Sequence, residues 1–136
     1  MLPFEFIVDG PPISHQTRNP ERLRAWQFAA RVAAKQYWPV ALPPLSTRLK
    51  LIVTYCHDGV AVRIDNDNMV KPIQDALIGL VYADDRQITD TQIRKTDING
   101  SFRVRGMSPV LAEGFCRGHE FLYIRIESTP DHEELI

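Results

Sequence analysis

Three segments of the chain alternate apolar and polar side chains, and this alternation constrains the fold more than any other feature of the sequence. They lie at residues 3–10, 46–57 and 120–127. In each segment every second residue is apolar, which is the period of a β-strand that buries one face. The apolar sets are Phe4, Phe6 and Val8; Leu49, Leu51, Val53 and Tyr55; and Leu122, Ile124 and Ile126. The sequence therefore predicts a sheet with one face packed against other elements.

Helical periodicity marks two segments between these strands. In the first, residues 20–38, Asn19 is a suitable N-cap and Pro20 a suitable first helical residue. In the second, residues 68–80, apolar residues recur every three or four positions, and Gly79 stands where a helix often ends. The aromatic residues of the first segment, Trp26, Phe28 and Tyr37, are interpreted as core residues rather than as platforms for unpaired bases.

The remaining stretches are less regular. Residues 86–97 suggest a further strand, but Ile88 and Ile93 fall on opposite parities, which a bulge or an edge position would explain. Residues 99–119 are glycine-rich and predict no element. The order of elements predicts an α+β fold (α/β, two layers), in which two main helices pack on a small mixed sheet. We expect a single domain over residues 1–136, with a loose tail at 128–136.

Composition restricts where such a chain can work. No apolar run is long enough to span a membrane, and the first residues lack the basic and apolar regions of a signal peptide. Two cysteines, Cys56 and Cys116, are too few for a disulfide scaffold and favour a reducing compartment. We therefore expect a cytoplasmic protein without a membrane segment.

Charge is unevenly distributed along the chain. Residues 1–50 carry seven Lys or Arg against three Asp or Glu, whereas residues 51–100 carry five against eight. A basic first third beside an acidic middle is compatible with a polyanion-binding surface that flanks a metal-binding pocket, and equally with an ordinary mixed surface.

The acidic middle concentrates its carboxylates around the second helical segment. Asp67, Lys71 and Asp75 are spaced four residues apart, so they form one line along a helix. Asp65 precedes this helix, and the pair Asp84 and Asp85 follows it. A short return of the chain could bring Asp85 beside Asp65 and Asp67, where three carboxylates would repel one another unless a cation lay among them.

Oxygen ligands without Cys or His favour Mg²⁺ or Mn²⁺, and such an ion activates water and stabilises charge on a phosphoryl group. The same residues also permit simpler interpretations. Asp and Asn before a helix are common caps, and an ion-pair ladder would contribute only a few tenths of a kcal/mol per pair. A calcium-binding EF-hand loop is excluded, because the positions that require Gly and Glu hold Val70 and Ala76.

Residues 65–88 resemble the signature of the RusA family of Holliday junction resolvases. That signature runs D-x-D-N-x-x-K, continues with an aspartate within an apolar helix, and closes on D-D-x-Q followed by Ile or Val. The matching residues are Asp65, Asp67, Asn68, Lys71, Asp75, Asp84, Asp85 and Gln87. Residues 10–16, after the first strand, are also similar to the start of the family.

The resemblance implies a crossover junction endodeoxyribonuclease, a homodimer that resolves four-way junctions in recombination and repair by symmetric phosphodiester hydrolysis. It implies Mg²⁺ as cofactor, with Mn²⁺ as a substitute. Asp65, Asp67 and Asp85 match the family's metal-binding carboxylates, with Asp84 as a further candidate ligand, and Lys71 matches its catalytic lysine. The stretch 99–119 is longer than in the family, which leaves junction preference and the dimer surface open.

Contacts to DNA phosphates are expected from basic residues on loops and helix faces. The basic candidates for these phosphate contacts are Arg18, Arg22, Arg63 and Arg86, with Arg103 and Arg105 as weaker ones. Asn68 is expected to support the site or to contact DNA. Two alternatives to the nuclease stay open at this point: a junction-binding protein that does not cleave, and a different Mg²⁺-dependent phosphohydrolase that acts on nucleotides.

Overall fold

The computed structural model describes residues 2–100 and 103–134. Its centre is a mixed sheet of four strands in the order β1-β4-β2-β3. Strands β2 and β3 run parallel, and β4 runs antiparallel to both β1 and β2. This confirms the predicted α+β class. The strands are β1 (Phe4–Asp9), β2 (Leu49–His57), β3 (Ile88–Asp97) and β4 (Phe121–Ser128).

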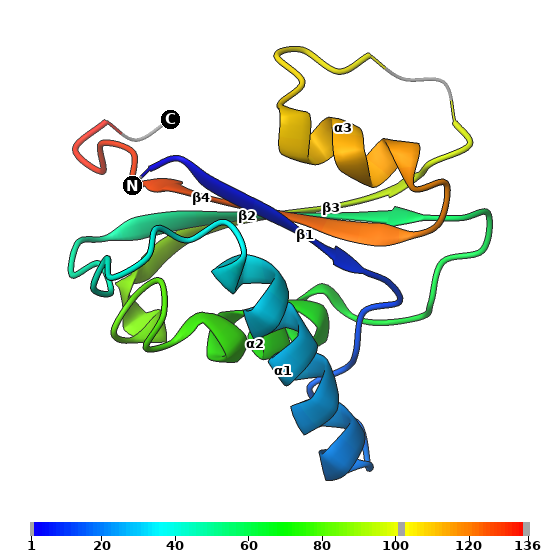
Figure 1. Ribbon diagram of the computed structural model, residues 1–136, viewed down its shortest axis with the longest axis horizontal. Helices are drawn as coiled ribbons and strands as arrows, with labels where there is room; N and C mark the ends of the chain where they lie inside the picture. The colour runs from blue at the N-terminus through cyan, green and yellow to red at the C-terminus, as the bar shows by residue number, and fades with distance from the viewer. Residues whose placement is uncertain (1, 101–102, 135–136) are drawn as a thin grey trace.

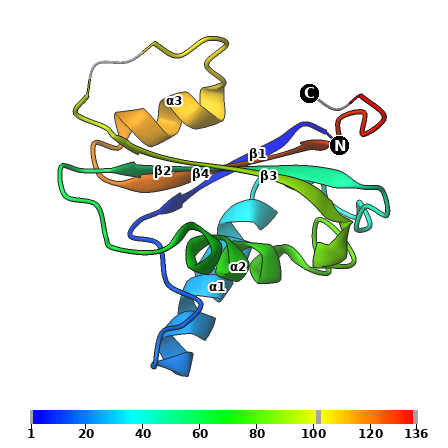
Figure 2. The same cartoon turned by 180° about the vertical axis from the view of Figure 1, so that it is seen from behind.

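The three alternating patterns form the three strands that were expected from them. Their apolar residues point to one face of the sheet and are almost fully buried, because two helices cover that face. These helices are α1 (Pro20–Lys35) and α2 (Asn66–Leu77), and they lie on the same side of the sheet in both views (Figure 1 and Figure 2). Burial of this apolar face is the main source of stability in such a fold.

A third helix, α3 (Pro109–Cys116), lies on the opposite face of the sheet (Figure 1). It falls within residues 99–119, where the sequence predicted no element. Ser108 caps it by accepting a hydrogen bond from the backbone N–H of Leu111, and Pro109 is its first residue. A cap followed by proline is a helix-start signal, but the eight residues of α3 are too few to show a clear apolar period.

The ends of α2 differ from the prediction of residues 68–80. The helix begins at Asn66, and it ends at Leu77 because the chain turns sharply at Gly79, whose φ is +82°. The backbone N–H of Gly79 donates to the carbonyl of Tyr82 at 2.7 Å, which closes this turn.

Strand β3 combines both features proposed for it. It is an edge strand, and the pairing register shifts between Leu49 and Lys50, opposite Ile88 and Asp90. This irregularity explains why Ile88 and Ile93 have opposite parities but both pack against the core.

Phe28 was expected in the core, but 70% of it is exposed. In the segment after β4, the hydroxyls of Thr129 and Thr89 lie 2.6 Å apart, and His132 contacts Asp90. No helix among the described residues is long and apolar enough to cross a membrane.

Candidate active site

Helix α2 presents the residues of the acidic motif on its exposed side. Its opposite side is buried against the sheet through Met69, Ile73 and Leu77. The carboxyl end of α2 is held by Arg31 of α1, whose Nη1 donates to the carbonyls of Ala76 at 3.1 Å and Ile78 at 2.7 Å. A guanidinium at a helix C-terminus satisfies free carbonyls and complements the helix dipole.

Lys71 is the centre of the motif. Its Nζ lies 2.6 Å from Oδ2 of Asp85 and 3.0 Å from Oδ1 of Asp75. The hydrogen bond to Asp85, followed by that to Asp75, raises the pKa of Lys71 above its ordinary value. The lysine is therefore a stable cation at neutral pH.

A short turn delivers Asp85 to Lys71. After α2 the chain forms a 3₁₀-helix, η1 (Asp85–Gln87), which leads directly into β3. The side chain of Gln87 holds this turn with four hydrogen bonds. Its Oε1 accepts from the backbone N–H groups of Ala83 and Asp84, and its Nε2 donates to the carbonyls of Leu45 and Thr47. The glutamine of the motif thus positions the aspartate two residues before it.

The adjacent aspartates have different surroundings. Asp84 caps η1 and forms an ion pair with Arg86 at 2.9 Å. These hydrogen bonds from Arg86 lower the pKa of Asp84 to about 2. Asp85 instead contacts Lys71, so of the two adjacent aspartates it is the one that lies against the exposed side of α2.

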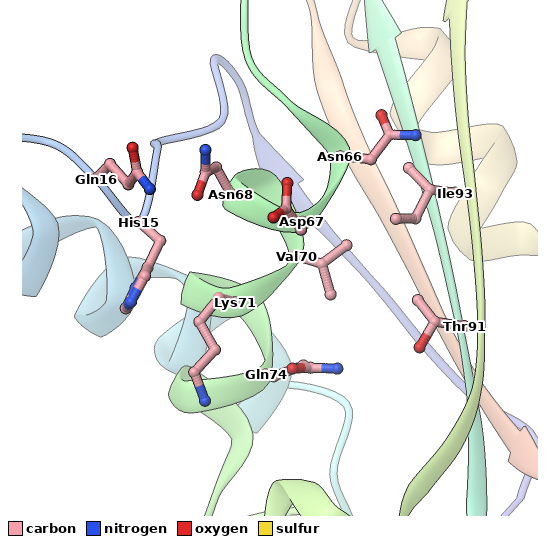
Figure 3. Close-up of a pocket in the computed structure, with 10 residues that line it drawn as sticks. All are labelled: His15, Gln16, Asn66, Asp67, Asn68, Val70, Lys71, Gln74, Thr91 and Ile93. Atoms are coloured by element: carbon pink, nitrogen blue, oxygen red, sulfur yellow. The ribbon is translucent and has the colours of Figure 1, made fainter.

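A pocket of about 700 Å³ opens beside this side of α2 (Figure 3). Asp67, Asn68 and Lys71 line it from the helix, and Thr91 and Ile93 line it from β3. His15 and Gln16 close it from the loop after β1, and the backbone N–H of His15 donates to the carbonyl of Asn68 at 2.8 Å. Gln16, Gln74 and Thr91 were not anticipated as pocket residues, because their proximity depends on how the loop and β3 pack against α2.

The carboxylates of the motif are only partly brought together. Asp65 is the N-cap residue of α2, but its side chain makes no capping hydrogen bond, and Asp67 is exposed in the first turn. The carboxylate of Asp85 pairs with Lys71 and does not join Asp65 and Asp67 in a cluster. Across residues 2–100 and 103–134, no three Asp, Glu, His or Cys side chains lie close enough to hold a metal ion. The three-carboxylate cluster expected from the sequence is therefore not preformed in this arrangement.

The donor chemistry nevertheless fits a hard divalent cation. Asp65 and Asp67, at the N-terminal end of α2, have carboxylates without a hydrogen bond or ion pair to any described residue. Lys71 and Asp85 meet further along the same helix, beside Asp75. All three candidate ligands supply oxygen, which Mg²⁺ prefers. Binding of an ion would require Asp85 to exchange Lys71 for the cation.

The basic candidates lie around this region on exposed positions. Arg18 and Arg22 lie at the start of α1, which extends beyond the sheet layers in both views (Figure 1 and Figure 2). The loop before this helix is fixed by Trp26, whose Nε1 donates to the carbonyl of Pro11 at 3.1 Å. Arg63 is exposed in the loop before α2, and Arg86 is exposed but paired with Asp84.

Comparison with known proteins places this site in a family. A family model described as endodeoxyribonuclease RusA matches residues 10–105, which include α1, β2, α2 and β3. No curated protein sequence matches the chain. The family match covers more than half of the chain and contains the whole acidic motif. The chain therefore belongs to the RusA family of endodeoxyribonucleases, which resolve crossover junctions by hydrolysing phosphodiester bonds.

Proposed function

We propose that the exposed side of α2 is the catalytic centre of a Mg²⁺-dependent nuclease that cuts four-way DNA junctions in recombination and repair. Asp65, Asp67 and Asp85 are its metal ligands in this proposal, and Lys71 is its catalytic cation. The observation that carries the proposal is an open pocket lined by Asp67 and by Lys71, whose ammonium group pairs with Asp85 at 2.6 Å.

The ion pair explains how a carboxylate-rich site remains stable without a metal. Lys71 offsets the charges of Asp75 and Asp85, which would otherwise repel each other and Asp67. When Mg²⁺ is bound, it activates water and stabilises the developing charge on the phosphoryl group. To serve as a ligand of the ion with Asp65 and Asp67, Asp85 would have to leave Lys71.

Lys71 gains a second role from this exchange. If Asp85 were bound to the ion, the Lys71 ammonium group would keep Asp75 as a partner and could contact a DNA phosphate in the pocket. A cation that contacts the charge formed in the transition state accelerates the reaction more than it tightens binding.

Symmetric cutting requires two such sites. We propose that two copies of the chain associate around a twofold axis, because a four-way junction needs two equivalent incisions and a closed dimer supplies two equivalent centres. The basic residues Arg18, Arg22 and Arg63 then contact phosphates around each pocket.

The test is substitution of Asp67 by Asn. Asp67→Asn removes a metal-binding charge but keeps the size of the side chain, so cleavage of a four-way junction in Mg²⁺ should fall by about 100-fold or more. Junction affinity, measured in EDTA by fluorescence anisotropy, should stay the same or increase because a charge that repels phosphate is lost. Asp131→Asn, an exposed acid after β4, is the matched control and should cut at the wild-type rate. Cleavage at the wild-type rate by Asp67→Asn would remove Asp67 from the metal site.

A further inference from the structure

The face of the sheet that α3 covers holds a second hollow, separate from the catalytic pocket. This groove of about 330 Å³ lies between α3, the segment before it, and the outer side of strands β2, β3 and β4. Helix α3 and part of that segment lie beyond residue 105, where the family match ends. The polar side chains that line the groove are Arg94, Arg103, Arg105, Thr54, Thr96 and Tyr123.

The groove is strongly basic. Three arginines line it, and no acidic residue in the described part of the chain does. The guanidinium groups of Arg94, Arg103 and Arg105 form no ion pair within residues 2–100 and 103–134, and each residue is exposed. Three uncompensated cations around one concave surface, in a chain of net charge -1, indicate a site for an anionic partner.

Strand β3 links the groove to the catalytic pocket. Thr91 and Ile93 line the pocket, whereas Arg94 and Thr96 line the groove. Successive residues of a strand point to opposite faces, so β3 presents one surface to each side of the sheet. The two surfaces share the edge strand but open in opposite directions.

Helix α3 is fixed firmly enough to form a wall of the groove. The rings of Phe115 and Phe121 pack edge to face at 5.5 Å. Gly114 permits this approach, because a Cβ at that position would lie 2.5 Å from the Phe121 ring. Arg117, just after the helix, pairs with Asp9 of β1 at 2.8 Å.

We propose that this groove binds the phosphate backbone of a second arm of the DNA junction, while the catalytic pocket holds the arm that is cut. Because the two surfaces open on opposite faces of the sheet, a straight duplex seated in the pocket leaves the groove to a different segment of DNA. A four-way junction supplies such segments, and arginine with threonine hydroxyls is a common set of phosphate contacts. The hydroxyl of Tyr123 is not counted among them, because it donates to Glu5. The inference rests on the proposed junction substrate and adds to it a surface that favours branched over linear DNA.

The experiment compares two pairs of charge-removing substitutions. Arg103→Gln with Arg105→Gln removes two cations of the groove, and Lys35→Gln with Arg48→Gln removes two exposed cations outside both surfaces. Dissociation constants are measured in EDTA over a range of salt concentrations, for a four-way junction and for a linear duplex of the same sequence. Binding in EDTA does not require the metal centre, so this result is independent of whether the protein cuts.

The groove variant should bind the junction about 10-fold more weakly, and the slope of log K against log salt should fall by about 2, one for each cation lost. Its affinity for the linear duplex should change less than twofold, and the control variant should show neither effect. Arg94→Gln alone should give the same selective loss with a slope change of about 1.

Junction affinity and slope equal to those of the control would overturn the proposal. Equal losses for junction and linear duplex would overturn it as well, because the groove would then not distinguish a second arm. If the wild-type protein does not cut junctions but the groove variant still shows the selective loss of binding, the proposed catalysis is contradicted and the groove is not.

Discussion

Among single residues, Lys71 is the one that holds two carboxylates of the site, those of Asp75 and Asp85. Its ammonium group binds Asp75 and Asp85 at once, and the hydrogen bond to Asp85 is the main reason that its pKa is raised. The ordinary pKa of lysine is about 10.4, so the stabilisation from this cation is complete below that pH and is lost only as the pH rises through the raised pKa. In the metal-free protein Lys71 therefore carries a positive charge at neutral pH.

Replacing Lys71 by Met tests this role. Lys71→Met keeps most of the aliphatic side chain but removes the charge, so the single-turnover rate of junction cleavage should fall by about 100-fold while affinity changes about 3-fold or less. In EDTA, the stability that these ion pairs contribute should not decline between about pH 7 and 10 in urea titrations, since the cation persists over that range. A loss of affinity as large as the loss of rate would show that Lys71 only binds DNA.

The line of Asp67, Lys71 and Asp75 could be predicted from the sequence, because a spacing of four residues places side chains on one side of any helix. The pair between Lys71 and Asp85 could not, because it depends on the turn that reverses the chain after Leu77. Phe28 shows the same limit: helical spacing suggested a buried ring, but the direction of the apolar side of α1 is set by how the helix packs.

Among the elements, the turn from α2 to β3 is the one that completes the site. The side-chain amide of Gln87 uses both acceptor positions of its oxygen and both of its N–H donors, and its four partners come from the turn and from residues 45–47. This bonding holds η1 against the body of the protein and keeps Asp85 in reach of Lys71.

Replacing Gln87 by Met should loosen this turn. Gln87→Met has a similar volume but leaves backbone donors and acceptors without partners, which should lower the free energy of unfolding by about 1–3 kcal/mol in urea titrations. Cleavage should also slow, because Asp85 loses its fixed position. Gln92→Met, at an exposed position of β3, is the matched control and should have little effect on either quantity. Wild-type stability and rate in the Gln87 variant would contradict a positioning role.

The strands β1, β2 and β4 were predictable because one buried face imposes a strict alternation. Helix α3 was not, because eight residues with a buried glycine show no apolar period, although Ser108 and Pro109 mark its start. The shortened end of α2 depends on Gly79, whose positive φ becomes evident only in the turn it forms.

In the whole molecule, the sheet separates α1 and α2, which carry the proposed catalytic pocket, from α3, which borders the proposed DNA-binding groove (Figure 2). The order of strands could not be predicted from their patterns, and this order makes β3 an edge strand shared by both surfaces. The family match covers α1, β2, α2 and β3, whereas α3 lies outside it.

The proposed dimer predicts the product formed by a mixed pair of subunits. A dimer of one wild-type subunit and one Asp67→Asn subunit, isolated with two different tags, has one active centre. It should nick a supercoiled cruciform plasmid once, whereas the wild-type dimer should linearise it. Linear product from the mixed dimer at the wild-type yield would contradict one incision per subunit.

The central claim is that Asp65, Asp67 and Asp85 hold a divalent cation beside α2 after Lys71 releases Asp85. The most direct measurement is the anomalous scattering of Mn²⁺ in crystals of the protein soaked with that ion. We predict a peak about 2.1 Å from carboxylate oxygens of these three aspartates, with Lys71 paired to Asp75 alone. Crystals that hold no ion at this position and keep the Lys71–Asp85 pair intact, from a preparation that cuts junctions in Mn²⁺, would contradict the account.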